Sequence, residues 1–172
     1  MPNIKTIIAS HNIKTTSKSK SPQAQELEQN RECNCRKKPD CPLERKCLQT
    51  NVIYQATVET DTSTETYVGL ATNFKERYRN HKTSFRHQNR RNETELSKHV
   101  WNLKDANKTF KIKWKIIKKC QPYSSVSKKC NLCLAEKYII ICKNHLCSLN
   151  KRNELASPCR HRNKYSLRNF IP

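Results

Sequence analysis

The stretch VIYQATVETDTSTETYVGL, residues 52–70, decides the fold. β-branched and aromatic side chains alternate with Gln55 and Thr57 over residues 52–58, and a second run of this kind covers residues 66–70. Alternation with a period of two is typical of strands that bury one face. The polar residues of the segment 61–64, between the two runs, form turns readily. The stretch therefore predicts an antiparallel β-hairpin.

Three helices are predicted downstream of the hairpin. Asn73 is a good N-cap, and Glu76 follows three residues later, which is the capping-box pattern of a helix start. Residues 94–103 and 131–143 repeat apolar side chains at helical spacing. The residues around which we expect the last helix to pack are Leu134, Tyr138 and Ile141.

One further strand is predicted between the second and third helices. Over residues 110–116 apolar side chains alternate with lysines, so the strand has one apolar face and one lysine face. The order strand, strand, helix, helix, strand, helix predicts an α+β domain. We expect a small three-stranded antiparallel sheet flanked by helices.

The composition limits both the core and the function. Only 34% of the 172 residues are apolar, below the roughly 45–50% of typical globular domains, so the core must be small. The single glycine, Gly69, excludes the Gly-rich phosphate loops of P-loop and dinucleotide-binding proteins. Neither a membrane span of about 20 apolar residues nor a secretory signal is recognisable. We therefore expect an intracellular, reducing location without a membrane partner.

The charge indicates a polyanionic partner. Lys and Arg number 35 against 14 Asp and Glu, which gives a net charge of +21. Such an excess is typical of nucleic-acid-binding proteins, whose basic side chains contact phosphates without reading the sequence. We expect a nucleic acid as the partner, with an acidic membrane surface or an acidic protein as the alternative. The candidate phosphate contacts are Arg86, Arg90, Arg91, Lys111, Lys113 and Lys115.

Two groups of cysteines have the spacing of metal sites. Thiolates are strong zinc ligands in tetrahedral structural sites, and disulfides are rare in reducing compartments. The first group lies within 15 residues and comprises Cys33, Cys35, Cys41 and Cys47. The second is expected to join a Cys-x2-Cys knuckle to the C-terminal segment and comprises Cys130, Cys133, Cys159 and His161. We expect two structural zinc ions, with free or paired thiols as the alternative.

Three further cysteines and one histidine lie near the second group in the sequence. Cys120, His145 and Cys147 are competing ligands, or, in the case of the cysteines, buried thiols. Cys142, inside an apolar helix, is expected to be buried.

The predicted organisation is a polar linker or tail (residues 1–32), a four-cysteine zinc module (33–50) and the α+β domain with the second zinc site (51–172).

The order of several motifs resembles a known nuclease family. Val52-Ile53-Tyr54 and, after 12 intervening residues, Tyr67-Val68-Gly69 are similar to the signature of the GIY-YIG endonucleases, with Val52 where the signature has glycine. The flanking segments CNCRKKPDCPLERKCL, KKCNLCLAEKYII and LNKRNELASPCRH resemble the endonuclease domain of Penelope-like retroelements. The positions that match the functional residues of the family are Tyr54, Tyr67, Arg77, His81, Glu136 and Asn150.

The resemblance implies a role for each of these positions. Glu136 would hold one catalytic Mg²⁺ (or Mn²⁺), and Arg77 would contact the scissile phosphate. One of the two tyrosines would act on the attacking water, and the resemblance leaves open which one. His81 would relay a proton or bind phosphate, and Asn150 would orient water or backbone.

The implied function is a DNA endonuclease whose nick leaves a 3′-hydroxyl that primes reverse transcription. Residues 1–32 would then end a polymerase-side linker, the partners would include the reverse transcriptase domain of the same polyprotein and the element RNA, and the location would be nuclear. The charge and the cysteine groups alone also fit a non-catalytic, zinc-stabilised nucleic-acid-binding module. Thiol redox chemistry is disfavoured, because a CxxC motif occurs once and without a thioredoxin-like context.

Overall fold

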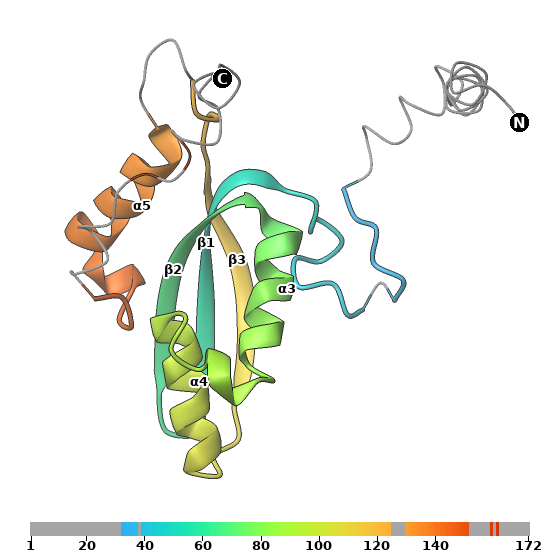
Figure 1. The fold of residues 1–172 in the computed structure, drawn as a ribbon, viewed down its shortest axis with the longest axis vertical. Helices are drawn as coiled ribbons and strands as arrows, with labels where there is room; N and C mark the ends of the chain where they lie inside the picture. The colour runs from blue at the N-terminus through green and yellow to red at the C-terminus, as the bar shows by residue number, and fades with distance from the viewer. Residues whose placement is uncertain (1–31, 38, 125–129, 152–158, 160, 162–172) are drawn as a thin grey trace, which may run out of the picture. The chain divides into compact units, whose positions relative to one another are not determined.

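The computed structural model describes residues 32–37, 39–124, 130–151, 159 and 161 (Figure 1). The chain divides into two units, Met1–Glu32 and Cys33–Pro172, and the folded elements belong to the second. The predicted linker, residues 1–32, lies outside the described residues except for its last position. The elements are β1 (Thr50–Glu59), β2 (Thr64–Asn73), α3 (Phe74–Ser84), the 3₁₀ turn η1 (Gln88–Arg90), α4 (Glu95–Asp105), β3 (Lys111–Lys119), α5 (Asn131–Cys142) and the 3₁₀ turn η2 (Asn144–Leu146).

The three strands form one antiparallel sheet in the order β2-β1-β3. The hairpin is confirmed, with Tyr54 of the central strand β1 opposite Gly69 of β2. On its other side Tyr54 is opposite Ile116 of β3, and the register shifts between Ile53 and Tyr54. The described part of the chain is therefore an α+β domain with a three-stranded antiparallel sheet and three helices, as the element order predicts.

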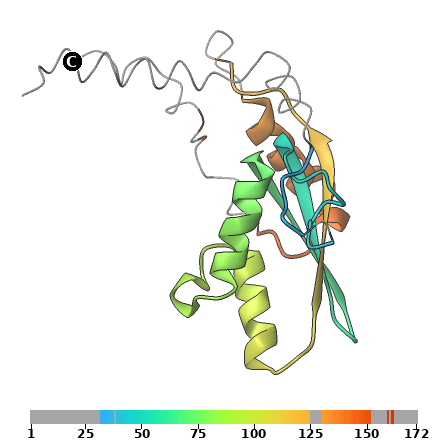
Figure 2. The same cartoon turned by 90° about the vertical axis from the view of Figure 1, so that its right-hand side faces the viewer.

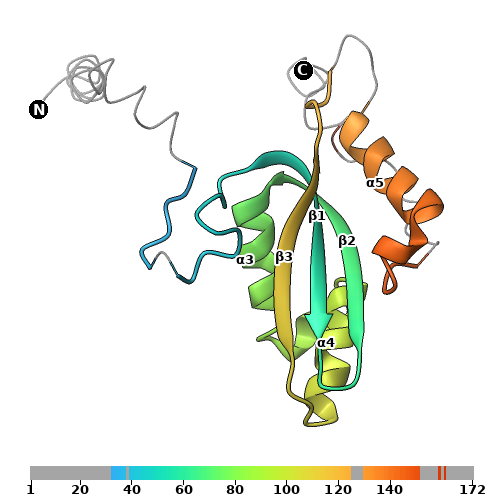
Figure 3. The ribbon, with the colours of Figure 1, turned by 180° about the vertical axis from the view of Figure 1, so that it is seen from behind.

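Alternation along the strands divides the apolar residues between the two faces of the sheet. On one face Tyr54 and Val58 pack with Phe74 of α3 and with Leu96 and Val100 of α4. Figure 2 shows α3 and α4 along this side of the sheet. On the opposite face, which is toward the viewer in Figure 3, a second cluster joins the sheet to α5. Its members from these elements are Ile53, Val68, Leu132, Ile139 and Ile140.

The starts of α3 and α4 carry side-chain caps. The Asn73 side chain accepts a hydrogen bond from the Glu76 N–H at 3.1 Å, which confirms the predicted helix start. Thr94 caps α4 in the same way by accepting from the Ser97 N–H at 3.0 Å. The cap at Asn73 places α3 directly after β2, so that α3 packs back on the sheet it has just left.

The orientation predicted for α5 is wrong. Leu134, Tyr138 and Ile141 are 57–58% exposed, whereas Leu132 and Ile139 are buried against the sheet. Cys142, predicted to be buried, is exposed. The helix is apolar on most of its circumference, so the spacing of its apolar residues does not define one buried face.

A polar contact accompanies the apolar packing of α5 on the sheet. The Glu136 carboxylate accepts a hydrogen bond from the backbone N–H of Leu70 in β2. This bond holds the helix with Glu136 toward the strand and leaves Leu134, Tyr138 and Ile141 on the outside. No helix in the described part of the chain is both long enough and apolar enough to cross a membrane.

Candidate active site and metal clusters

Tyr54 is the centre of a polar cluster between the sheet and α3. Its side chain is fully buried, and its hydroxyl lies 2.7 Å from His81 Nε2. The same hydroxyl accepts a hydrogen bond from Arg77 Nε at 3.1 Å. Arg77 and His81 are four residues apart in α3, so one helical turn presents both to the same phenol.

Gly69 makes the position of Tyr54 possible. A Cβ atom at residue 69 would lie 2.5 Å from the Tyr54 hydroxyl oxygen and 3.1 Å from the Tyr67 ring. Such distances are well inside van der Waals contact, so a larger residue would displace the phenol. The only glycine of the chain is therefore at a strand position where a tyrosine ring lies directly over the backbone.

Tyr67 completes the group of four aromatic and basic residues. Its ring centre lies 6.5 Å from that of Tyr54 and 6.1 Å from that of His81. Burial lowers the pKa of Arg77. The charge interactions and hydrogen bonds with Tyr54 and Tyr67 together raise it by a larger amount, so the pKa lies above its usual range. The guanidinium is half-buried and stays cationic beside two phenols.

His81 is neutral in this setting. Burial, and second the positive charge of Arg77, lowers its pKa from 6.5 to about 3. A neutral imidazole nitrogen can accept the proton of the Tyr54 hydroxyl while Arg77 donates to the hydroxyl oxygen. The structure therefore brings Tyr54, Tyr67, Arg77 and His81 together in one cluster.

The shifted His81 pKa predicts a specific dependence of stability on pH. Between about pH 3 and the unfolded-state value near 6.5, the unfolded chain binds more protons than the folded chain, so stability falls as the pH is lowered. From pH 7.5 to pH 5 the loss due to His81 is roughly 2 kcal/mol. Urea unfolding at a series of pH values in the presence of zinc measures it. In His81→Gln the decrease in the free energy of unfolding from pH 7.5 to pH 5 should be smaller by this amount. If the free energies of the wild type and the variant fall in parallel, the pKa of His81 is not lowered in the folded chain.

Glu136 and Asn150 bind the outer edge of β2 on the two sides of Gly69. Glu136 Oε1 accepts from the Leu70 N–H at 3.1 Å. Asn150 accepts from the Val68 N–H at 2.8 Å and donates to the Val68 carbonyl at 2.9 Å, as a neighbouring strand would. Both side chains are half-buried, and both are anchored within one residue of the glycine under the Tyr54 ring.

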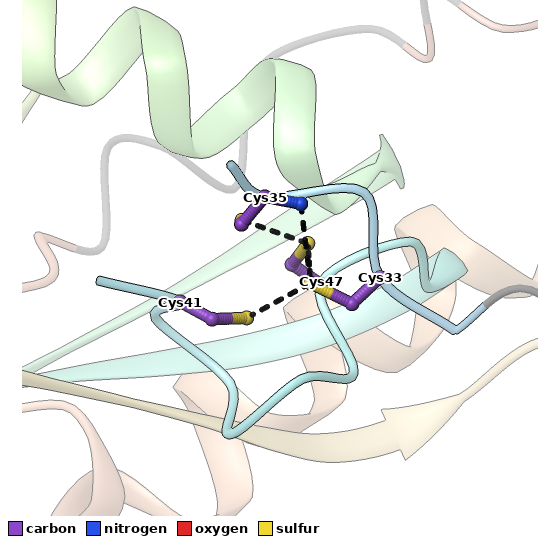
Figure 4. A group of neighbouring side chains, drawn as sticks. All are labelled: Cys33, Cys35, Cys41 and Cys47. Carbon is purple, nitrogen blue, oxygen red and sulfur yellow. Dashed lines mark hydrogen bonds between the residues drawn. The ribbon is translucent and has the colours of Figure 1, made fainter. Parts of the chain in front are cut away.

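The four thiols of the first predicted zinc site lie together (Figure 4). The Sγ atoms of Cys33 and Cys41 are 3.6 Å apart, those of Cys35 and Cys47 are 3.6 Å apart, and all four lie within 4.8 Å of one another. Four thiolates around a tetrahedral ion at 2.3 Å are separated by about 3.8 Å. All four are free thiols, and the group could hold a metal ion, with a donor set and spacing that fit zinc.

Backbone N–H groups and burial act on these thiols in opposite directions. A hydrogen bond from the Cys35 N–H lowers the pKa of Cys33 to about 7. The Arg45 N–H donates to Cys41 Sγ at 3.2 Å. Burial raises the pKa of Cys47 to about 12. Because thiolates are the ligands, metal binding here must release protons, so its affinity rises with pH.

The first cysteine group lies against the start of α3. Lys75 Nζ donates to Cys35 Sγ at 3.7 Å and also bonds Asn34. The Phe74 N–H donates to the Gln49 carbonyl at 2.9 Å, and Leu43 belongs to the core beneath α3 and α4. The module thus fixes the end of the helix that carries Arg77. Neither Lys75 nor Gln49 has a sequence pattern that could have predicted this contact.

The second predicted site is assembled in the same way. Cys133 Sγ lies 3.4 Å from Cys159 Sγ and 3.2 Å from His161 Nδ1, and Cys130 Sγ lies 3.5 Å from the same nitrogen. These spacings fit three Zn–S bonds of 2.3 Å and one Zn–N bond of about 2.0 Å. This group too could hold a metal ion. Burial raises the pKa of Cys133, so metal binding must displace its proton.

The spare cysteines and His145 do not join either cluster among the described residues. Cys147 is buried, and its Sγ lies 3.6 Å from the Lys143 carbonyl, which suits a packed thiol. Cys120 is half-buried, and His145 is exposed. The ligand alternatives that the sequence leaves open are therefore resolved, within the described residues, toward Cys159 and His161.

The six predicted phosphate contacts lie in two different places. Arg86 is exposed after α3, whereas Arg90 pairs with Glu93 and Arg91 pairs with Asp105 at 3.0 Å. The lysines of β3 are all exposed. Their side of the sheet is the one opposite Tyr54, as their register with β1 shows: Lys111, Lys113 and Lys115 are opposite Glu59, Thr57 and Gln55.

Comparison of this chain with protein-family models, curated proteins and solved structures finds no match.

Proposed function

We propose that this chain is a Mg²⁺-dependent DNA endonuclease of the GIY-YIG type. The observation that carries the proposal is the cluster of Tyr54, Tyr67, Arg77 and His81, in which two phenols, a cationic guanidinium and a neutral imidazole meet over a glycine. The edge of β2 beside this glycine holds the Glu136 carboxylate. These are the groups that phosphodiester hydrolysis needs: a charge for the phosphate, a proton acceptor and a metal ligand.

Arg77 is the group that binds the scissile phosphate. Its side chain is half-buried, and its planar fork suits phosphate oxygens. The bond from Nε to the Tyr54 hydroxyl orients that fork. Tyr54 is fully buried and is therefore a positioning residue, held in turn by His81.

Tyr67 is the tyrosine that acts on the attacking water. It keeps 5% of its surface exposed, whereas Tyr54 keeps none. A free phenol with a pKa near 10 is a poor base, but the nearby charge of Arg77 favours the phenolate. Tyr67 would take the proton of the water as its oxygen attacks phosphorus. The bond between phosphorus and the 3′ oxygen of the cleaved strand would break, and this oxygen would take a proton from solvent water, which gives a 3′-hydroxyl.

Glu136 would hold the catalytic Mg²⁺. A carboxylate is the ligand type that this ion prefers, and the Leu70 N–H orients this one toward the β2 edge. Bound there, the ion would neutralise charge on the phosphate and the leaving oxygen. Asn150 would keep the same edge of β2 in place through its two bonds to Val68.

The two cysteine groups would hold structural zinc. Each supplies four protein donors, which closes the coordination of zinc and leaves no position for a substrate or water. The first ion would stabilise the start of α3, and the second would join α5 to the segment that contains Cys159. Since the core is small, metal binding would supply part of the folding free energy.

The biological role follows from the resemblance of the flanking segments to Penelope-like retroelements. The nick would provide the 3′-hydroxyl primer for reverse transcription of the element in the nucleus. Partners would be target DNA, the element RNA and the reverse transcriptase domain of the same polyprotein. A net charge of +21 supports binding to nucleic acid.

Nicking of supercoiled plasmid tests the proposal. We expect the zinc-loaded chain to convert supercoiled to open-circular DNA with Mg²⁺ or Mn²⁺ and not with EDTA. Glu136→Gln, which keeps the size and a hydrogen-bond acceptor for Leu70, should lower the rate by at least about 100-fold. Binding without nicking of any DNA form by the wild-type chain would favour the non-catalytic module, which the charge and the cysteine groups support by themselves.

A further inference from the structure

A row of lysines lies on the face of the sheet that the proposed active site does not use. Residues directly opposite each other in a sheet point to the same face. Lys115 is opposite Gln55, whereas Tyr54 is opposite Ile116, so Lys111, Lys113 and Lys115 point away from Tyr54 and Arg77. Figure 3 shows the sheet from this side. A DNA segment bound at Arg77 cannot reach these lysines without passing around the sheet.

The row continues past the register shift in β3. Beyond that shift Lys118 is opposite Ile53, which faces α5, so Lys118 rejoins the lysine face. Lys113 pairs with Glu59, and no ion pair of Lys111 or Lys115 is found among the described residues. Alternate residues of a strand are about 6.7 Å apart, which is close to the separation of successive phosphates in an extended nucleic-acid strand.

A groove of about 400 Å³ lies at the end of this row, between β3 and α5. Lys118 and Lys119 line it from the strand, and Leu134 and Tyr138 line it from the helix. Tyr138 is 57% exposed, and Leu134 and Ile141 continue an exposed apolar stripe along α5. The groove therefore has ammonium groups on one wall and an accessible aromatic ring on the other.

The lysines and the exposed apolar side chains of this surface together favour one kind of ligand. A second copy of the chain would bring another +21 charge against lysines that already flank the stripe. A DNA duplex satisfies the lysines but keeps its bases stacked inside, so the apolar stripe would stay exposed. A single strand offers both phosphates for the lysines and unstacked bases for Tyr138 and Leu134.

We infer that the β3 lysine row and the groove beside α5 form a binding surface for a single-stranded polynucleotide, with Tyr138 stacking on a base. The surface is separate from the proposed nuclease centre and does not require cleavage. In a protein that also nicks DNA, it would hold a strand released from the duplex or an RNA strand.

Anisotropy titrations with the full, zinc-loaded chain and EDTA-free, Mg²⁺-free buffer test this surface. The probes are fluorescent 20-nucleotide DNA and RNA single strands of mixed sequence and the matching DNA duplex. Tyr138→Ala should weaken single-strand binding about tenfold through the lost stacking, while Tyr138→Phe, which keeps the ring, binds as the wild type does. The duplex should bind both variants equally well.

Paired lysine variants provide the charge control. Lys111→Gln/Lys115→Gln should lower the slope of log affinity against log salt for single strands by about 1.4, or 0.7 for each phosphate contact. Arg79→Gln/Lys82→Gln removes the same charge from two exposed positions of α3 and should leave that slope unchanged. Equal losses in both double variants, or unchanged single-strand binding by Tyr138→Ala, would overturn the proposal.

The remaining outcomes are equally decisive. Tyr138-dependent binding of either DNA or RNA supports the surface, and the ratio of the two affinities identifies which strand it prefers. Sedimentation velocity over a range of protein concentrations tests the other occupant. Self-association that Tyr138→Ala abolishes, without any change in single-strand binding, would assign the stripe to a second copy of the chain and refute the inference.

Discussion

Replacing Arg77 with alanine is expected to lower the rate of Mg²⁺-dependent nicking by at least about 100-fold, with the fold retained. The guanidinium is the cation of the cluster, and loss of such a group leaves the charge of the phosphate in the transition state uncompensated. Arg77→Lys should lose most of this rate as well, because an ammonium group lacks the planar fork that can bond the Tyr54 hydroxyl through Nε and two phosphate oxygens through the other nitrogens.

The chain offers a matched control two residues further along the same helix. Arg79→Ala removes the same side chain from an exposed position of α3 and should leave the nicking rate unchanged. Rates are measured under single-turnover conditions, and duplex affinity is measured in parallel. If Arg77→Ala nicks at the wild-type rate, or if Arg79→Ala loses as much as Arg77→Ala, the assigned phosphate contact is wrong.

Replacing Cys47 with serine should remove one zinc ion per chain and destabilise the fold by several kcal/mol. Cys47 is fully buried among the three other thiols of the first cluster, so no other side chain can take its place as a ligand. The midpoint of thermal unfolding should fall by roughly 10 °C. Nicking should fall too, because the module contacts the start of α3 through Lys75 and Gln49.

Zinc content by mass spectrometry of the native protein and the unfolding midpoint measure these effects. Cys142→Ser is the control, since this thiol is exposed and lies outside both clusters. It should keep two zinc ions and the wild-type midpoint. A Cys47→Ser protein with unchanged metal content would show that the first cysteine group is not a zinc site.

The hairpin and the start of α3 could be predicted from the sequence because local rules determine them. Alternation in residues 52–58 defines the buried face of β1, and Asn73 with Glu76 supplies the cap. The two cysteine groups could be predicted as well, since their ligand types and spacing are specific to metal sites. The third strand was predicted only approximately. It begins after Phe110 and runs to Lys119, because pairing with β1 continues past the register shift.

The rotation of α5 and the relation between the two basic regions could not be predicted. Apolar residues surround most of α5, so local spacing does not show that Leu132, Ile139 and Ile140 are the ones that pack on the sheet. The bond from Glu136 to Leu70, which accompanies this packing, joins residues 66 positions apart. The β3 lysines lie on the face of the sheet away from Tyr54 because of the register in which β3 pairs with β1. Local sequence patterns do not determine that register. The burial of Tyr54 likewise depends on Gly69 in the neighbouring strand.

The convergence of Glu136 with the Tyr67 and Arg77 side chains is tested most directly by locating Mn²⁺ in crystals of the chain. Anomalous diffraction distinguishes this ion from zinc bound by the cysteine groups, which could hold metal ions. We expect one Mn²⁺ within bonding distance of the Glu136 carboxylate, at the edge of β2 beside Gly69. Mn²⁺ bound elsewhere, or a Glu136 carboxylate that faces away from both residues with no ion beside it, would contradict the proposed nuclease centre.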